Sequence, residues 1–102
     1  MTKFLVDKAA NIPEDHLRSV TFGGKEILFV KNEGKYFAIN NICSHSGAKL
    51  HEGILEKNIL VCPWHGAKWN IRTGKLVWFT QSLENLESYN VVVENDHVFV
   101  EI

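Results

Sequence analysis

The chain has 102 residues, which is the size of one domain and too short for a two-domain enzyme. Hydrophobic residues make up 45% and charged residues 23%, a composition that excludes a disordered chain. The net charge of -1 argues against nucleic acid as a partner, because phosphate binding needs a basic surface. The first residues show no signal-peptide pattern, and no segment approaches the roughly 18 apolar residues of a membrane span. We therefore expect a soluble, cytoplasmic protein that does not bind membranes.

Runs of β-branched and aromatic residues predict strands along most of the chain. The first hairpin is expected over residues 20–30, around a Gly-Gly turn. A turn at residues 32–34 then leads into a strand at 36–39. The last hairpin spans residues 89–102, around an Asn-Asp turn. This spacing predicts an all-β fold, a small sandwich or barrel in which helices play little part.

Residues 40–74 differ from the rest of the chain. They contain both cysteines, four of the seven glycines and two of the three tryptophans, yet no linker sets them apart. We therefore predict one domain over residues 1–102, with a loop-rich subdomain at about 40–74 inserted in the β scaffold. Helical periodicity is confined to two short stretches, at residues 13–18 and 82–87, where we expect short helices.

Two close Cys/His pairs lie inside that subdomain. Cys43 and His45 form the first pair, and Cys62 and His65 form the second. Each histidine is soon followed by Gly-Ala-Lys, so each loop can turn tightly and point backbone N–H groups inward. In a reducing compartment, cysteines so placed are metal ligands in preference to a disulfide. The pattern predicts two loops that grip one metal centre.

Two metals suit this set of two sulfur and two nitrogen ligands. A tetrahedral zinc ion would act as a structural staple, but zinc loops usually pair cysteine with cysteine and histidine with histidine. Here each loop carries one residue of each type. A diiron cluster with two cysteines on one iron and two histidines on the other accepts this mixed arrangement. The residues therefore favour an iron–sulfur cluster, with a zinc-stapled interaction module as an alternative.

The spacing Cys43-x-His45, sixteen residues, then Cys62-x-x-His65 resembles the Rieske [2Fe–2S] signature. Residues 62–75 are also similar to the second cluster loop and the following strand of soluble Rieske-type ferredoxins. The resemblance implies that the cofactor is a Rieske-type [2Fe–2S] cluster. It also implies that Cys43 and Cys62 bind the inner iron and that His45 and His65 bind the outer iron.

The same resemblance implies a single-electron carrier and not an enzyme in its own right. The expected donor is a flavoprotein NAD(P)H reductase, and the expected acceptor is a terminal oxygenase of the aromatic-ring-hydroxylating type. An all-protein ligand set agrees, because it leaves no open coordination position for a substrate. The alternative within the family is the small Rieske-like subunit of an assimilatory nitrite reductase.

The chain departs from the respiratory-complex Rieske proteins at four positions. Their extra pair of cysteines, which forms a disulfide between the loops, is replaced here by Ala48 and Trp64. Their serine and tyrosine, which donate hydrogen bonds to the cluster sulfurs, are replaced by Ala67 and Trp69. The resemblance therefore implies a reduction potential at the low end of the Rieske range. A third loop covers the cluster in many relatives, and residues 78–82 are expected to take that place.

Several other side chains near the loops leave two interpretations open. Trp64 lies between two predicted ligands, and it either shields the cluster or offers an aromatic surface to a partner. Lys49 and Lys68 follow the two loops, and they are either solvated or steer an acidic partner. His51 is expected to be an ordinary half-buried histidine, with contact to the cluster loop as the alternative.

Overall fold

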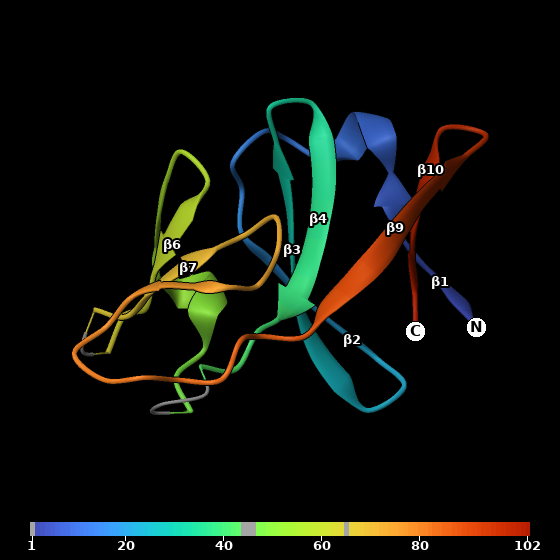
Figure 1. Cartoon of the computed structure of the whole chain (residues 1–102). Helices are drawn as coiled ribbons and strands as arrows, with labels where there is room; N and C mark the ends of the chain where they lie inside the picture. Colours follow the sequence, from blue (N-terminus) through green and yellow to red (C-terminus); the bar gives the residue numbers. More distant parts are fainter. Residues whose placement is uncertain (1, 44–46, 65) are drawn as a thin grey trace.

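The computed structural model describes residues 2–43, 47–64 and 66–102. Over this part of the chain the architecture is almost entirely β (Figure 1), as the sequence predicts. The strands of the larger sheet are β1 (Lys3–Lys8), β2 (Arg18–Phe22), β3 (Lys25–Asn32), β4 (Lys35–Asn40), β9 (Ser88–Glu94) and β10 (His97–Glu101). Those of the smaller sheet are β5 (Ile54–Glu56), β6 (Ile59–Val61), β7 (Lys68–Asn70) and β8 (Leu76–Trp78). Two short 3-10 turns complete the fold: η1 (Ala9–Asn11) and η2 (Leu50–Glu52).

The predicted hairpins are confirmed, and their turns explain why those residues stand there. Gly23 and Gly24 join β2 to β3 with φ angles of 57° and 76°. Asn95 and Asp96 join β9 to β10 with φ angles of 50° and 62°. Positive φ at both central residues is the geometry that matches the twist of a tight hairpin, and glycine, asparagine and aspartate reach it at the lowest cost. Residues 33–34 make the corresponding turn between β3 and β4.

The larger sheet curls into a barrel that is nearly closed. Its strand order is β1-β10-β9-β4-β3-β2, and each described pairing is antiparallel. The two edge strands β1 and β2 meet where the rings of Phe4 and Phe22 stack with centroids 5.0 Å apart. At the opposite side, β4 and β9 pair over a short stretch at the end of β4 and then diverge (Figure 1).

Strand β3 is buried on both faces and so joins the two sheets. Because side chains alternate along a strand, Ile27 and Phe29 point into the barrel while Leu28 and Val30 point to the opposite face. Leu28 and Val30 belong to the same apolar core as Trp69 of β7. The smaller sheet, with strand order β5-β6-β7-β8, therefore packs on the outside of the barrel.

A polar clamp holds the smaller sheet against the β3–β4 hairpin. The buried side chain of Asn32 donates from Nδ2 to Asp15 Oδ1, at 2.9 Å, and to the carbonyl oxygen of Lys57, at 3.0 Å. Its Oδ1 accepts a hydrogen bond from the guanidinium of Arg72 at 3.2 Å. Arg72 also pairs with Glu33 at 2.7 Å. Because Lys57 and Arg72 belong to the loops of the smaller sheet, these bonds fix its position on the barrel.

The first predicted helix, at residues 13–18, is wrong. Glu14 forms an isolated parallel bridge with Lys31, and the amide of Asp15 donates to the Lys31 carbonyl at 2.7 Å. Asp15 also has a φ of 58°, which ends any helical turn. Pairing with β3 has overridden the weak local preference.

The second predicted helix, at residues 82–87, is also wrong. This stretch is extended and irregular, and its Leu86 amide donates to the carbonyl of Gly74 at 2.8 Å. Asn85 Oδ1 accepts from the amide of Leu76 at 3.0 Å. The segment therefore satisfies its polar groups against the chain around β8 and not within a helix. Among the described residues, neither helical turn is long and apolar enough to span a membrane.

Candidate metal centre

The two predicted ligand loops close in the same way. Each begins a seven-residue pattern, Cys-x-x-x-Gly-Ala-Lys, at Cys43 or at Cys62. The amide of Cys43 donates to the carbonyl of Ala48 at 2.9 Å. The amide of Cys62 donates to the carbonyl of Ala67, also five residues on, at 2.7 Å. One local sequence therefore makes one loop shape twice, in different surroundings.

Glycine is required in both loops by the backbone angle. Gly47 has a φ of 73° and Gly66 a φ of 75°, in the region that side chains with a Cβ rarely adopt. A Cβ at either position would meet no described atom within 4 Å. The backbone conformation, and not lack of space, therefore explains the predicted tight turns.

The two cysteines lie deep in one apolar core. Cys43 is 1% exposed and Cys62 is 2% exposed, and among the described residues they are not disulfide-bonded to each other. Described members of the same buried core near the loops are Ala48, Leu50, Leu60, Ala67 and Trp69. A buried thiolate needs a partner of opposite charge, and a bound metal provides it. The sulfur positions and their apolar walls thus fit a metal–sulfur group.

The predicted ligands His45 and His65 lie outside the described residues. Within the described residues no three histidine, cysteine or acidic side chains gather as a metal site. The structure therefore brings the two cysteine loops into one core, and it does not describe where the two histidines lie.

Asn41 is the residue next to the site that the sequence reasoning missed. It is fully buried, and its Nδ2 donates to Glu26 Oε2 at 2.8 Å. Its Oδ1 accepts from the amide of His51 at 2.8 Å, and its Nδ2 lies 2.9 Å from His51 Nδ1. The Asn41 carbonyl accepts from the amide of Leu50 at 2.7 Å. These bonds tie both ends of the first loop to β3. The available signal was a polar residue directly after β4 and two residues before the cysteine.

His51 therefore has a structural role at the base of the first loop. It lies in η2 and bonds to Asn41, which is two residues from Cys43. Nearby, Lys49 pairs with Glu26 at 2.8 Å, and the hydrogen bond from Lys49 lowers the pKa of Glu26, with Asn41 adding to the effect. Lys49 is thus tied to the scaffold and is not simply solvated.

The second loop is held mainly by close main-chain packing. A Cβ on Gly53 would lie 2.2 Å from the carbonyl oxygen of Val61 and 3.3 Å from Cδ of Pro63. Gly53 stands between η2 and β5, and the next residue, Ile54, pairs with Val61, so the chain leaving the first loop runs directly beside the start of the second. This close approach helps to hold the two loops at a fixed separation.

Aromatic side chains surround the loop region. Trp64 and Trp78 are 56% and 52% exposed, and Lys68 Nζ lies 5.9 Å from the centroid of the Trp78 ring. Phe79, in the expected covering segment, packs against the core that contains the cysteines. Trp69 is fully buried, which agrees with its expected packing role. The exposure of Trp64 favours an aromatic surface over a shield.

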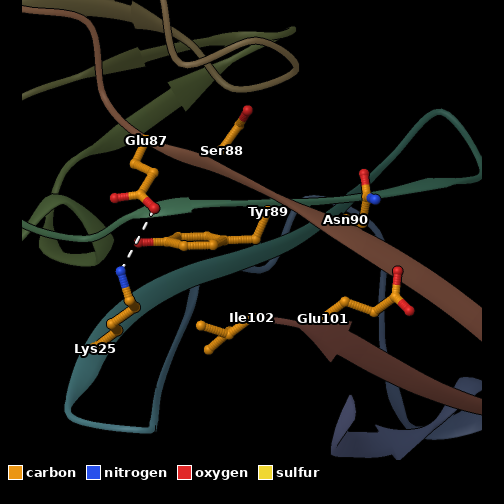
Figure 2. A pocket seen from close by; sticks show the side chains of 7 residues that line it. All are labelled: Lys25, Glu87, Ser88, Tyr89, Asn90, Glu101 and Ile102. Carbon is orange, nitrogen blue, oxygen red and sulfur yellow. Dashed lines mark hydrogen bonds and ion pairs between the residues drawn. The ribbon is translucent and has the colours of Figure 1, made fainter. Parts of the chain in front are cut away.

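A separate hollow of about 410 Å³ lies on the larger sheet, beside the C-terminal residue Ile102 (Figure 2). Lys25 Nζ lies 3.5 Å from Glu87 Oε1 and 5.6 Å from the centroid of the Tyr89 ring. Burial raises the pKa of Tyr89, and the charge and hydrogen bond of Glu87 raise it further. The residues that line the hollow come from outside residues 40–74 and include no cysteine. It is therefore not part of the candidate metal centre.

Two matched loops, one leaving the larger sheet and one within the smaller sheet, bring two buried cysteines into one apolar core, which fits an iron–sulfur protein. Residues 2–90 match the model of the Rieske [2Fe-2S] domain family, and the chain belongs to this family. Its cofactor is therefore a Rieske-type [2Fe–2S] cluster and not a zinc staple. The predicted fold class is confirmed as well.

The relatives differ in how much of their own length this chain covers. The ferredoxin component of a naphthalene 1,2-dioxygenase system from Pseudomonas aeruginosa is 31% identical, over 100% of this chain and 99% of the relative. A ferredoxin component of naphthalene 1,2-dioxygenase/salicylate 5-hydroxylase systems from Ralstonia sp. is 33% identical over the same shares. Human apoptosis-inducing factor 3 is 37% identical over 90 residues, but this chain spans only 15% of its length.

Solved structures show the same fold over almost the whole chain. The ferredoxin of carbazole 1,9a-dioxygenase from Nocardioides aromaticivorans IC177 superposes with a TM-score of 0.91 at 25% identity, covering 98% of this chain and 97% of that one. A chain in a complex of reduced oxygenase and oxidized ferredoxin from a carbazole 1,9a-dioxygenase superposes with a TM-score of 0.88, also at 25% identity, covering 96% of this chain and 100% of that one.

Proposed function

We propose that this chain is a single-electron carrier that takes electrons from a flavoprotein NAD(P)H reductase and passes them to a terminal aromatic-ring-hydroxylating oxygenase. The observation that carries the proposal is the end-to-end match to ferredoxin components of naphthalene dioxygenase systems. Those relatives are named as ferredoxin components of dioxygenase systems, which supports an electron-transfer component in preference to an enzyme by itself.

Cys43 and Cys62 are proposed to bind the inner iron, and His45 and His65 the outer iron. The matched loop closures and the shared apolar core around the two cysteines support the first half of this assignment. The second half rests on the ligand spacing in the sequence. The bound cluster supplies a site that accepts and returns one electron. The chain's own part is to keep the cysteine sulfurs dry and the two loops at a fixed separation.

Residues 1–102 are proposed to act as one Rieske domain, with residues 40–74 as its cluster-binding subdomain. The core shared between β3 and the smaller sheet supports this division, because neither sheet buries its apolar face alone. We also propose that the carrier is soluble and cytoplasmic, because its full-length relatives are ferredoxin components of dioxygenase systems.

The test is to purify the protein and follow an electron through it. We expect a red-brown protein with iron and acid-labile sulfide in equal amounts, and a paramagnetic resonance signal that develops on reduction. Reduction by NADH with a flavoprotein reductase, followed by reoxidation with an oxygenase and its substrate, would support the proposal. A colourless zinc protein would overturn it. Copurification with a large sirohaem subunit would show instead that the chain is the small subunit of an assimilatory nitrite reductase.

The ligand assignment is tested by substitution. Cys62→Ala or His45→Ala should abolish stable cluster assembly, because each removes one of the four predicted protein ligands. His97→Ala is the matched control: His97 lies in β10 and bonds to the carbonyl of Asn95, so the cluster should be retained. Iron and sulfide content and the resonance spectrum of the reduced protein are the measurements. An unchanged spectrum in either ligand variant would show the assignment to be wrong.

A further inference from the structure

The indole N–H of Trp69 is a buried donor that no described group accepts. Trp69 is 0% exposed, and its Nε1 has no hydrogen-bond partner among the described residues. Leaving such a donor unpaired is unfavourable, and buried tryptophans usually find an acceptor. The packing of the chain thus holds a polar atom in place without giving it a partner, which indicates that the partner is not part of the polypeptide described.

Strand register places this donor on the same side of the sheet as a cysteine. In the β6–β7 pair, Leu60 lies opposite Trp69. Cys62 follows Leu60 by two residues, so both side chains stand on one face. The bond from the Cys62 amide to the Ala67 carbonyl continues the pairing beyond the strand. Trp69 and Cys62 are therefore diagonal neighbours, and a side chain as long as tryptophan reaches that far across antiparallel strands.

The side chains of the core around Trp69 offer sulfur as an acceptor. Trp69 belongs to the core that contains both cysteines, Leu60 and Ala67, and the described members of that core are apolar or cysteine side chains. Within it, sulfur is the acceptor chemistry that the described side chains provide.

We propose that the indole N–H of Trp69 donates a hydrogen bond to a sulfur of the bound cluster, either that of Cys62 or a bridging sulfide, and so raises the reduction potential. A donor near sulfur favours the more negative, reduced state over the oxidised state. The expectation of a low potential, which rested on the loss of a tyrosine at this position, is thereby partly offset. The proposal rests on the proposed cluster ligation.

The test compares wild type with Trp69→Phe, which keeps an aromatic ring and removes the donor. At equal iron and sulfide content, we expect the equilibrium with a redox mediator to shift roughly three- to tenfold toward the oxidised protein. Trp78→Phe is the matched control, because it removes the N–H of an exposed indole and should shift the equilibrium little. An unchanged equilibrium in a fully loaded Trp69→Phe protein would overturn the proposal.

A second measurement needs no variant. In wild-type protein with 15N-labelled indole, the reduced cluster should show magnetic coupling to one tryptophan Nε1 and to an exchangeable proton. Absence of the tryptophan nitrogen coupling would overturn the proposal even if Trp69→Phe failed to bind a cluster. If the wild-type protein contained no cluster, the proposed function would fail instead, so the two failures are distinguishable.

Discussion

The two cysteine loops have the same shape but are held in place by different means. Both close through a bond from the cysteine amide to the alanine five residues on, and both turn at a glycine with φ near 75°. The first loop leaves β4 of the larger sheet and is fixed by the side chain of Asn41. The second joins β6 to β7 of the smaller sheet and is fixed by main-chain packing against Gly53.

This difference shows that the shape of each loop is set locally, while the distance between the loops is set by long-range contacts. A seven-residue sequence is enough to set the shape of each loop, because its turn and closing bond lie within it. The distance between the loops depends on contacts across the fold, including the Asn32–Arg72 clamp that fixes the smaller sheet. A cluster with ligands from both loops needs both conditions. Substitutions that act on one loop should therefore reveal how each is held.

The largest effect is expected at Gly53, where the chain leaving the first loop lies against the start of the second. Gly53→Ala would place a Cβ 2.2 Å from the Val61 carbonyl oxygen, so the chain after η2 or the start of the second loop must move. We expect a loss of about 3 kcal/mol in the free energy of unfolding, at the upper end for overpacking. Cluster content should fall with it. Urea unfolding and iron analysis measure the two effects.

Gly34→Ala is the control for this substitution. Gly34 has a φ of 76°, but a Cβ there meets no described atom within 4 Å. Its cost should be that of backbone strain alone, about 1 kcal/mol, with the cluster retained. Equal losses at Gly53 and Gly34 would show that the close approach beside the second loop is not what positions it.

The sequence was sufficient for the local features and insufficient for the long-range ones. Turn residues such as Gly23–Gly24 and Asn95–Asp96 predicted the hairpins, because positive φ is a property of the residues themselves. The repeated Cys-x-x-x-Gly-Ala-Lys pattern likewise predicted two tight loops. The helices expected at residues 13–18 and 82–87 failed because pairing with β3 and with the chain around β8 outweighed their weak propensity.

The role of Asn41 could not be predicted for the same reason. Its partners Glu26 and His51 lie 15 and 10 residues away, and only the folded β3–β4 hairpin brings them together. The buried donor of Trp69 is a similar case: the sequence suggested an aromatic core residue, but only register shows its position diagonal to Cys62. Residue type predicts chemistry, while burial and pairing decide how that chemistry is used.

Asn41→Ala should affect the first loop and leave the second in place. It leaves the Leu50 bond, which is made by the backbone, but removes the side-chain acceptor of the His51 amide and a donor to Glu26. We expect a loss of about 2 kcal/mol in the free energy of unfolding, because buried partners become unpaired. Asn90→Ala, an exposed change on β9, is the surface control. Hydrogen exchange should speed up at the Cys43 amide and not at the Cys62 amide; equal changes would contradict the separate anchoring of the loops.

The matched glycines test whether the two loops are equivalent in themselves. Gly47→Ala and Gly66→Ala each place a Cβ in open space at nearly the same φ. Each should therefore cost about 1 kcal/mol, the strain of a left-handed residue with a side chain. Calorimetry of the two variants side by side gives the comparison. A difference larger than the cost itself would mean that the surroundings, and not the seven-residue sequence, set the loop shape.

The smallest expected effect is an acid sensitivity confined to the first loop. The pKa of Glu26 is lowered by the hydrogen bond from Lys49 and then by that from Asn41, so the folded state holds fewer protons here than the unfolded chain. The stabilisation is therefore complete above the ordinary pKa of 4.5 and is lost as the pH falls through the lower folded value. The corresponding lysine of the second loop, Lys68, lies over the Trp78 ring, which does not titrate, so this contact adds no such dependence.

Glu26→Gln should abolish this sensitivity, since the amide cannot form the charged pair with Lys49. The measurement is the difference in unfolding free energy between wild type and variant at pH 7 and below pH 4.5, which cancels the acid response of other carboxylates such as Asp7. Glu56→Gln, an exposed change on β5, is the control. In wild type, exchange protection of the Cys43 amide should fall in acid more than that of the Cys62 amide. If both fell together, acid would be acting on the whole fold, and the distinction between a side-chain anchor and a main-chain anchor would not hold.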